Sequence, residues 1–439
     1  MLYLNAEDLT FEPILLDYIK NLQDVVKTQQ QLIGPNNKKF LHIVALYDGS
    51  KNSTKTNLFG LNLDGRGTYR LVIQPDGNYT LGQNIWDLGE RNLGAPETLA
   101  RFVNWGMDLY PAQNYYLSID DHGDGVYGLS QDKTSNDILT PEEVYAALKN
   151  ATLNGQEQRK IDILDYEACL MGLAENANDV KQWVNYLMAF PQISWGINTY
   201  PTYFKDLQPQ DTPAQVVPRL VQRYSAEAFQ ANNGLGYPHV VAAYDMTKMT
   251  AVRNAVNSLA DTLLVEGTTT MTEVNTLRDK SQAYANSDDA TNPDHADYID
   301  LWDLADNLSS LAPTEVQDVK DAVDAAVVEE KHASGFVSGF FWGHGNTHGL
   351  SIYFPPTQTS TAFGKYPTRY QMSQNGTWDE FLAAFVWPDG DPTDPANAGK
   401  GASSSRGASS SRTQEKLNNV DPSIYITGDH LNYLPTILK

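Results

Sequence analysis

The hydrophobic positions along the chain follow two patterns that alternate, short continuous apolar runs and longer segments with helical spacing. The continuous runs predict strands covered on both faces, as in a parallel sheet, and they lie at 2–4, 40–47, 115–119 and 161–164. Between them, residues 11–26 and 96–109 place apolar side chains on one helical face. Strands alternating with helices indicate an α/β fold with a mostly parallel central sheet.

The remaining pattern adds further elements. Residues 69–73 and 78–81 read as a hairpin around Pro75-Asp76-Gly77, and Thr140-Pro141-Glu142-Glu143 carries the signals of a helix start. Further helices are predicted at 212–229, 246–265, 298–311, 316–328 and 377–387, and further strands at 186–190, 239–244 and 349–354.

Two residues with catalytic chemistry follow predicted strands. The run at 115–119 leads into Asp120-Asp121-His122-Gly123, and the run at 161–164 leads to Cys169, the only cysteine of the chain. Ligands of open α/β sheets lie beyond the carboxyl ends of the strands, so His122 and Cys169 are expected to converge there.

Cys169 has two interpretations. Helical spacing resumes from Leu170, so we expect the thiol at a helix N-terminus, where the peptide dipoles favour the nucleophilic thiolate. The alternative is a small buried apolar cysteine, because free cysteine is among the most buried residue types.

A histidine on the neighbouring loop would give this thiol its base. The backbone N–H groups of Gly123 and Cys169 would then form an oxyanion hole for the reacting carbonyl. A serine hydrolase is disfavoured, because the chain has no Gly-x-Ser-x-Gly elbow.

Charge and composition limit the kinds of binding partner and indicate a domain boundary. The net charge of −23 repels phosphate, which disfavours nucleic acid and anionic membranes. No apolar run approaches the roughly 20 residues that span a bilayer, and no signal peptide is visible. From residue 389 the composition changes to Asp, Pro, Gly and Ser, with Gly-Ala-Ser-Ser-Ser-Arg repeated at 401–406 and 407–412. We therefore expect one domain over 1–388 and a flexible linker and tail over 389–439.

The chain resembles the clostripain family of cysteine peptidases, relatives of gingipains, legumains and caspases. The resemblance runs from about residue 1 to about residue 388. It rests on motifs in family order: Leu93-Gly94 to Leu99, Tyr110-Pro111-Ala112, His122-Gly123, Asp132-Lys133-Thr134-Ser135 with Leu139-Thr140, Glu167-Ala168-Cys169-Leu170-Met171-Gly172, Trp195-Gly196 with Tyr200-Pro201, and Gly349-Leu350-Ser351-Ile352-Tyr353-Phe354-Pro355.

The resemblance implies a caspase-like three-layer α/β/α sandwich with His122 and Cys169 as the catalytic dyad. It also implies cleavage of protein or peptide substrates after Arg or Lys, through a thioester acyl-enzyme. Glu167 stands where the family usually has aspartate and would pair with the basic side chain, with Ser194 and Trp195 also lining the substrate site. Legumain-like relatives with Glu-Ala-Cys read asparagine, so Asn preference is one alternative, and an inactive binding module that keeps the fold is another.

The sequence also offers candidate sites for self-cleavage and for calcium binding. Family members often cleave themselves between the histidine and the cysteine, where the basic residues are Lys133, Lys149, Arg159 and Lys160, and the linker offers Arg406 and Arg412. No cofactor is expected to be required, although Asp288, Asp289, Asp294 and Asp297 could hold calcium. We expect a monomer, secreted, periplasmic or on the surface of a bacterium.

Overall fold

A computed structural model describes residues 1–33, 40–154, 157–265, 268–284, 296–337, 339–356 and 366–386. Its central sheet has the strand order β15-β12-β11-β10-β5-β1-β2-β3-β4. The strands are β1 (Leu2–Ala6), β2 (Val44–Gly49), β3 (Thr68–Val72), β4 (Ile85–Asp87), β5 (Tyr116–Asp120), β10 (Ile161–Glu167), β11 (Val184–Ala189), β12 (His239–Asp245) and β15 (Val327–Ala333).

The middle of the sheet is parallel and its edges are antiparallel. Strands β11, β10, β5, β1 and β2 run in one direction, while β12, β15, β3 and β4 pair antiparallel at the two sides. The parallel strands are the continuous apolar runs of the sequence, because a strand covered on both faces buries every side chain.

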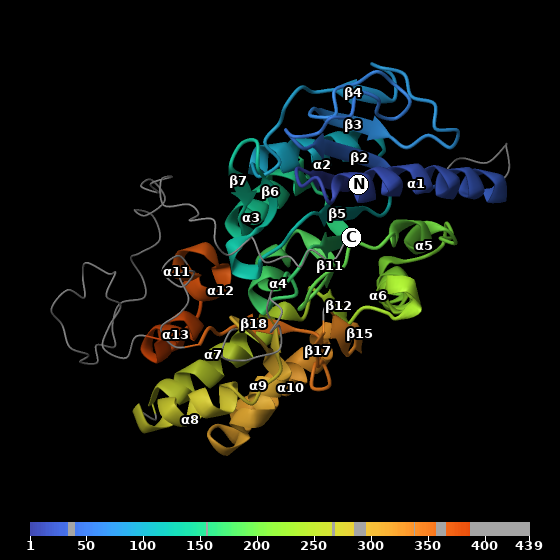
Figure 1. Ribbon diagram of the computed structural model, residues 1–439. Coiled ribbons are helices and arrows are strands. Elements are labelled where there is room, and N and C mark those ends of the chain that lie inside the picture. The colour runs from blue at the N-terminus through green and yellow to red at the C-terminus, as the bar shows by residue number, and fades with distance from the viewer. Residues whose placement is uncertain are drawn as a thin grey trace.

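Helices cover both faces of the sheet. On one face lie α1 (Glu12–Ile33), α5 (Tyr200–Phe204) and α6 (Pro213–Gln230), and on the other lie α2 (Pro96–Leu109), α3 (Pro141–Thr152), α4 (Ala174–Val180), α7 (Met249–Val265) and α10 (Pro313–Ala326). Figure 1 shows α1, α5 and α6 on the right of the sheet and α3, α4 and α7 on the left. Along β1, Leu2 and Leu4 enter one core and Tyr3 the other. The predicted three-layer α/β/α sandwich is confirmed.

Smaller elements complete the described structure. They are β6 (Leu129–Asp132), β7 (Asp137–Leu139), β8 (Leu153–Asn154), β9 (Glu157–Gln158), α8 (Thr268–Arg278), β13 (Ala283–Tyr284), β14 (Tyr298–Asp300), α9 (Leu301–Asn307), β16 (Gly335–Val337), β17 (Phe340–Trp342), β18 (Ser351–Tyr353), α11 (Tyr366–Arg369), α12 (Gln371–Gln374) and α13 (Trp378–Val386). The predicted boundary at 388/389 and the tail lie outside the described residues.

Two predicted elements are wrong. The partner of β3 is β4 at 85–87 and not 78–81, because Asn78 and Thr80 take part in side-chain turn contacts with Asp76 and Asn84. The segment from Tyr298 begins as strand β14, and its helix starts only at Leu301, where the Asp300 carboxylate caps the N–H groups of Trp302 and Asp303.

Candidate active site

The parallel register of β5 and β10 brings the two predicted catalytic loops together. Asp120 pairs with Glu167 at the carboxyl ends of these strands, so His122 and Cys169 follow the same paired position. A Cβ atom on Gly123 would lie 2.5 Å from the carbonyl oxygen of Cys169 and 3.0 Å from its nitrogen. The backbones of the two loops are therefore in direct contact, and the convergence expected from topology is present.

His122 is held by a residue that the sequence reasoning missed. Its Nε2 lies 3.4 Å from Oδ2 of Asp8, and the Phe11 ring packs on the imidazole at a centroid distance of 4.5 Å. Lys133 Nζ lies 2.8 Å from the same oxygen. Hydrogen bonds from His122 and from Lys133 keep the pKa of Asp8 well below its ordinary value.

Cys169 is almost fully buried, with 5% of its surface exposed. Its Sγ lies 3.7 Å from the carbonyl oxygen of Ser194. Burial raises the pKa of the thiol to about 12, and the charges of Asp124 and Glu167 act in the same direction. Burial therefore favours the neutral thiol of Cys169 over the thiolate.

The expectation of a thiolate favoured by a helix N-terminus is wrong. Helix α4 begins only at Ala174, and Cys169 lies in the turn before it. Leu170 adopts φ +62°, and its N–H donates to the carbonyl of Gln192 at 3.1 Å. This left-handed residue breaks the helical path that the apolar spacing indicated, since αL geometry does not continue an α-helix.

Glu167 is buried directly before the cysteine turn, with 4% exposed. Its Oε1 accepts a hydrogen bond from Ser194 Oγ at 2.8 Å, and its Oε2 accepts one from Tyr203 OH at 3.4 Å. Burial raises the pKa of Glu167 well above its ordinary value, and the nearby charges of Asp165 and Asp120 add to this. A neutral Glu167 would ionise when a cation enters beside it.

A cluster of acids and tyrosines surrounds Glu167. Tyr200 OH donates to Asp120 Oδ2 at 2.9 Å, and Tyr116 OH donates to Asp165. Burial is the main cause that raises the pKa of Asp165, to about 7. Phenol donors thus partner one oxygen of Asp120 and one of Asp165, which lowers the cost of burying these groups, while Oδ1 of Asp165 has no hydrogen-bond partner among the described residues.

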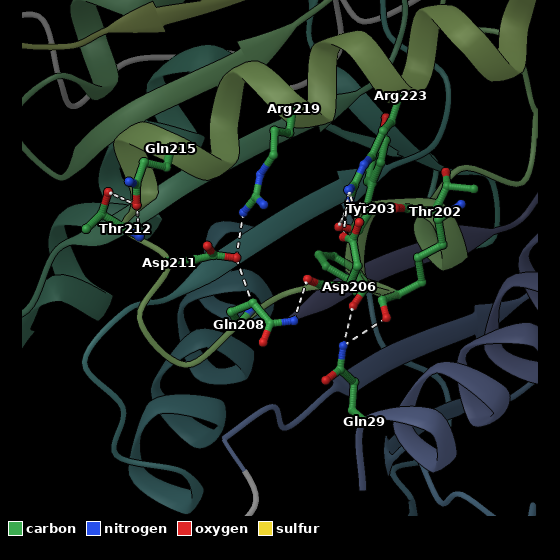
Figure 2. Close-up of polar contacts among 12 residues, drawn as sticks. Gln29, Thr202, Tyr203, Asp206, Gln208, Asp211, Thr212, Gln215, Arg219 and Arg223 are labelled. Carbon is green, nitrogen blue, oxygen red and sulfur yellow. Dashed lines mark hydrogen bonds and ion pairs between the residues drawn. The ribbon is translucent and has the colours of Figure 1, made fainter. Parts of the chain in front are cut away.

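Helix α5 supplies two of these tyrosines, and charged contacts fix its position. Figure 2 shows Arg223 of α6 donating to the carbonyls of Thr202 and Tyr203, at 2.8 and 2.9 Å, and pairing with Asp206. From the other side, Gln29 of α1 donates to the carbonyls at the end of α5. Tyr203 is therefore held toward Glu167 by both neighbouring helices.

Trp195 lies on the loop that follows β11, next to Ser194. Its ring stacks on Tyr237 at 4.3 Å, its Nε1 donates to the carbonyl of Pro238 at 2.6 Å, and its N–H donates to Tyr224 OH. Ser194 therefore bridges Glu167 and Cys169, whereas the contacts of Trp195 are with Tyr237, Pro238 and Tyr224.

Of the other predicted residues that the structure describes, Lys133 is the one that contacts a partner of His122, since it pairs with Asp8. Lys149 lies in α3, Arg159 pairs with Asp108 at 3.0 Å, and Lys160 precedes β10. Asp288, Asp289, Asp294, Arg406 and Arg412 lie outside the described residues. Asp297 is described, and its carbonyl accepts a hydrogen bond from Phe354.

Asp8 could have been found from one signal in the sequence. The first strand leads directly into Glu7-Asp8, and a strand that neighbours β5 in parallel ends at the same sheet edge. The sequence alone does not give the strand order, which places β1 next to β5.

A mostly parallel sheet with a histidine loop and a cysteine turn on adjoining strand ends defines the class of cysteine peptidases with a caspase-like fold. Comparison with known families agrees, since residues 20–387 match the model of the clostripain family. The chain belongs to the clostripain family.

Individual relatives are distant in sequence. Clostripain from Hathewaya histolytica is 27% identical over 126 residues, which cover 24% of this chain and 23% of clostripain. A secreted cysteine protease from Bacteroides thetaiotaomicron, solved with an irreversible peptide inhibitor, has a TM-score of 0.61 at 13% identity over 86% of this chain and 98% of that one. An inactive zymogen protease from Parabacteroides distasonis has a TM-score of 0.55 at 16% identity over 87% and 96%. These structures share the fold. Among the described helices, none is long and apolar enough to cross a membrane.

Proposed function

We propose that this protein is a cysteine endopeptidase that cleaves after Arg or Lys, with Cys169 as nucleophile and His122 as general base. The observation that carries the proposal is the contact of the Gly123 loop with the Cys169 turn, which follows the buried carboxyl of Glu167 by two residues.

The reaction starts from a neutral thiol. His122 takes the proton of Cys169 as the sulfur attacks the carbonyl carbon of the scissile bond. The backbone N–H groups of Gly123 and Cys169 are the donors for the resulting oxyanion. His122 then returns the proton to the leaving amine as the C–N bond breaks, and water hydrolyses the thioester.

Specificity for a basic side chain follows from Glu167. Its buried carboxyl accepts hydrogen bonds from two hydroxyl groups, and no basic side chain among the described residues pairs with it. A guanidinium or ammonium that enters beside it would therefore add a charge-assisted hydrogen bond. The acidic net charge of −23 also favours approach of basic substrates.

One set of assays tests this function. Reporter peptides ending in Arg, Lys or Asn are given to wild type, Cys169→Ala, His122→Ala and Glu167→Gln. We expect no turnover by the first two variants and a selective loss of Arg and Lys cleavage in the third. Glu175→Gln is the matched control, because Glu175 is also buried but accepts hydrogen bonds from Tyr353 and Tyr366 instead of from Ser194 and Tyr203.

Four results would contradict parts of the proposal. Turnover by Cys169→Ala would exclude Cys169 as the nucleophile. Equal cleavage of basic substrates by Glu167→Gln and wild type would exclude Glu167 as the residue that recognises the basic side chain. Cleavage of the Asn peptide alone would favour the legumain-like alternative, whereas an inert wild type after intact-mass checks would favour a binding module.

We also propose self-cleavage after Lys133. This residue lies in the turn between β6 and β7, its side chain is 40% exposed, and its Nζ shares Asp8 with His122. Lys149 is held in a helix instead, and Arg159 is paired with Asp108. A solved relative described as a zymogen supports the idea of processing, and one described as secreted supports export.

Intact mass tests the processing step. Wild type is expected as two fragments divided after Lys133, and Cys169→Ala and Lys133→Ala as single chains, with Lys149→Ala still cleaved. A single uncleaved chain for both wild type and Cys169→Ala would rule out self-processing.

A further inference from the structure

The two-stranded ribbon of β16 and β17 exposes three phenylalanine rings. Phe336, Phe340 and Phe341 are 69%, 49% and 57% exposed. Phe336 and Phe341 pair across the two strands, with their ring centroids 5.1 Å apart. Residues 333–343 include no charged residue, although the chain has a net charge of −23. An exposed aromatic cluster of this kind marks a site of interaction, and no step of the proposed reaction uses this one.

The opposite side of the ribbon is fixed to the protein core. Val337 and Trp342 are 5% and 2% exposed and belong to the core on one face of the central sheet. The Trp342 ring lies 5.8 Å from the ring of Trp195, which in turn stacks on Tyr237 at 4.3 Å. The ribbon is therefore anchored by large buried side chains, and it holds the three phenylalanine rings outward.

The ribbon lies at the same edge of the sheet as the catalytic residues. Strand β12 runs antiparallel to β11, and β15 runs antiparallel to β12, so β15 ends at the edge where the parallel strands end. The ribbon follows directly after β15. Its anchor, Trp195, adjoins Ser194, which contacts both Cys169 and Glu167. A continuous series of contacts thus joins the ribbon to the nucleophile.

The strand order indicates which part of a substrate reaches the ribbon. His122 follows β5, Cys169 follows β10, Trp195 follows β11 and the ribbon follows β15, in the order of these strands across the sheet (Figure 1). In the proposed reaction His122 protonates the leaving amine, so the segment after the scissile bond lies on the β5 side. The residues before the scissile bond then extend the other way, past Trp195 toward the ribbon.

The area of the exposed rings suits a side chain of a peptide better than a folded partner. Burying an aromatic side chain removes about 150–250 Å² from water, so the exposed parts of the three rings amount to about 350 Å². A stable interface between two copies needs about 800 Å² on each partner. An anionic membrane is disfavoured by the net charge of −23.

We propose that Phe336, Phe340 and Phe341 form a docking surface for an aromatic or large aliphatic side chain of the peptide substrate, on the amino-terminal side of the scissile bond. This inference rests on the proposed function and narrows its substrate class to peptides that carry an apolar residue upstream of the basic one. The docked side chain lies away from the reacting atoms, so its contacts should be equal in the ground state and the transition state. They should therefore lower KM and leave kcat unchanged.

A positional scan of reporter peptides tests the docking surface. Each peptide ends its acyl part in Arg, has alanine elsewhere, and carries one Phe that is moved through the positions before the scissile bond. We expect wild type to show a KM about tenfold lower when Phe occupies the preferred upstream position. The double variant Phe336→Ser, Phe341→Ser should lose this preference and cleave the peptide without Phe like wild type.

Three controls make the result specific. Leu81→Ser removes an apolar side chain that is 52% exposed and next to β4, at the opposite end of the sheet, and it should keep the preference. A Phe placed after the scissile bond should change KM equally in wild type and in the double variant. The Tm of the double variant should match that of wild type, because both rings are exposed, and Phe336→Ser alone replaces it if the Tm falls.

Failure of the docking surface can be told apart from failure of the proposed function. If wild type and the double variant prefer upstream Phe equally, or if wild type cleaves Arg peptides with no upstream preference, the docking proposal is overturned and the peptidase function stands. A wild type that cleaves no basic peptide would overturn both. A wild-type dimer that is lost in the double variant, with the peptide preference unchanged, would assign the ribbon to contact with a second copy and overturn the proposal.

Discussion

Gly123→Ala is the substitution that most directly tests how the two catalytic loops meet. The new methyl group would lie 2.5 Å from the carbonyl oxygen of Cys169, 2.9 Å from Cβ of Ala168 and 3.0 Å from the nitrogen of Cys169. Since Gly123 does not have a positive φ, alanine adds a clash and no backbone strain. The change therefore separates the loops and does little else.

The size of the effect follows from the clash. A carbon and a carbonyl oxygen need about 3.3 Å, so the gap must widen by about 0.8 Å. Misplacement of about 1 Å at reacting atoms costs about 10²-fold in rate, and loss of one oxyanion donor costs about 10²–10³-fold. We expect kcat/KM to fall about 10²-fold, while stability falls by only about 1–3 kcal/mol.

The assay compares initial rates on an Arg reporter peptide with single-turnover acylation, and Tm is measured in parallel. Gly345→Ala is the matched control, because a Cβ there meets nothing within 4 Å. It should keep wild-type rates. A Gly123→Ala enzyme within threefold of wild type would refute the idea that these two backbones position the reaction.

Three further outcomes are expected. Asp8→Asn should lower kcat roughly fivefold with KM unchanged, because it weakens a partly exposed contact to His122 worth about 1 kcal/mol; an unchanged kcat would remove Asp8 from the site. Burial raises the pKa of Glu167, so its carboxylate form is lost as the pH falls. KM for an Arg peptide should therefore rise toward low pH, by up to about tenfold per pH unit, while KM for an Asn peptide should not change. If KM changes with pH in the same way for both peptides, this explanation is wrong. Arg223→Met should destabilise the protein by about 2 kcal/mol and raise KM, because it removes the hydrogen bonds that hold α5. Arg219→Met breaks the ion pair with Asp211 and should leave KM unchanged. Thermal unfolding and KM measurements on both variants test this.

The sequence predicted most of the sheet because parallel strands buried on both faces leave continuous apolar runs. It also placed His122 and Cys169 correctly at adjoining strand ends, since that follows from strand–helix alternation. It could not show that Leu170 turns left-handed, and so the helix was predicted too early and the thiol was expected to be ionised.

Contacts between distant segments were also beyond the sequence. Asp8 meets His122 only because β1 pairs with β5, and the polar partners of Glu167 come from the loop at Ser194 and from α5. No local pattern encodes such pairings, which depend on strand order and on the packing of whole helices.

The central place of β1 has a consequence for how this protein assembles. The first strand of the chain lies between β5 and β2, and it carries Asp8 at its end. Without residues 1–8 the sheet would be divided into β15-β12-β11-β10-β5 and β2-β3-β4, each with an unpaired strand edge. Strand β1 is therefore paired on both sides only once the strand that begins at Tyr116 is in place, and only then can Asp8 contact His122.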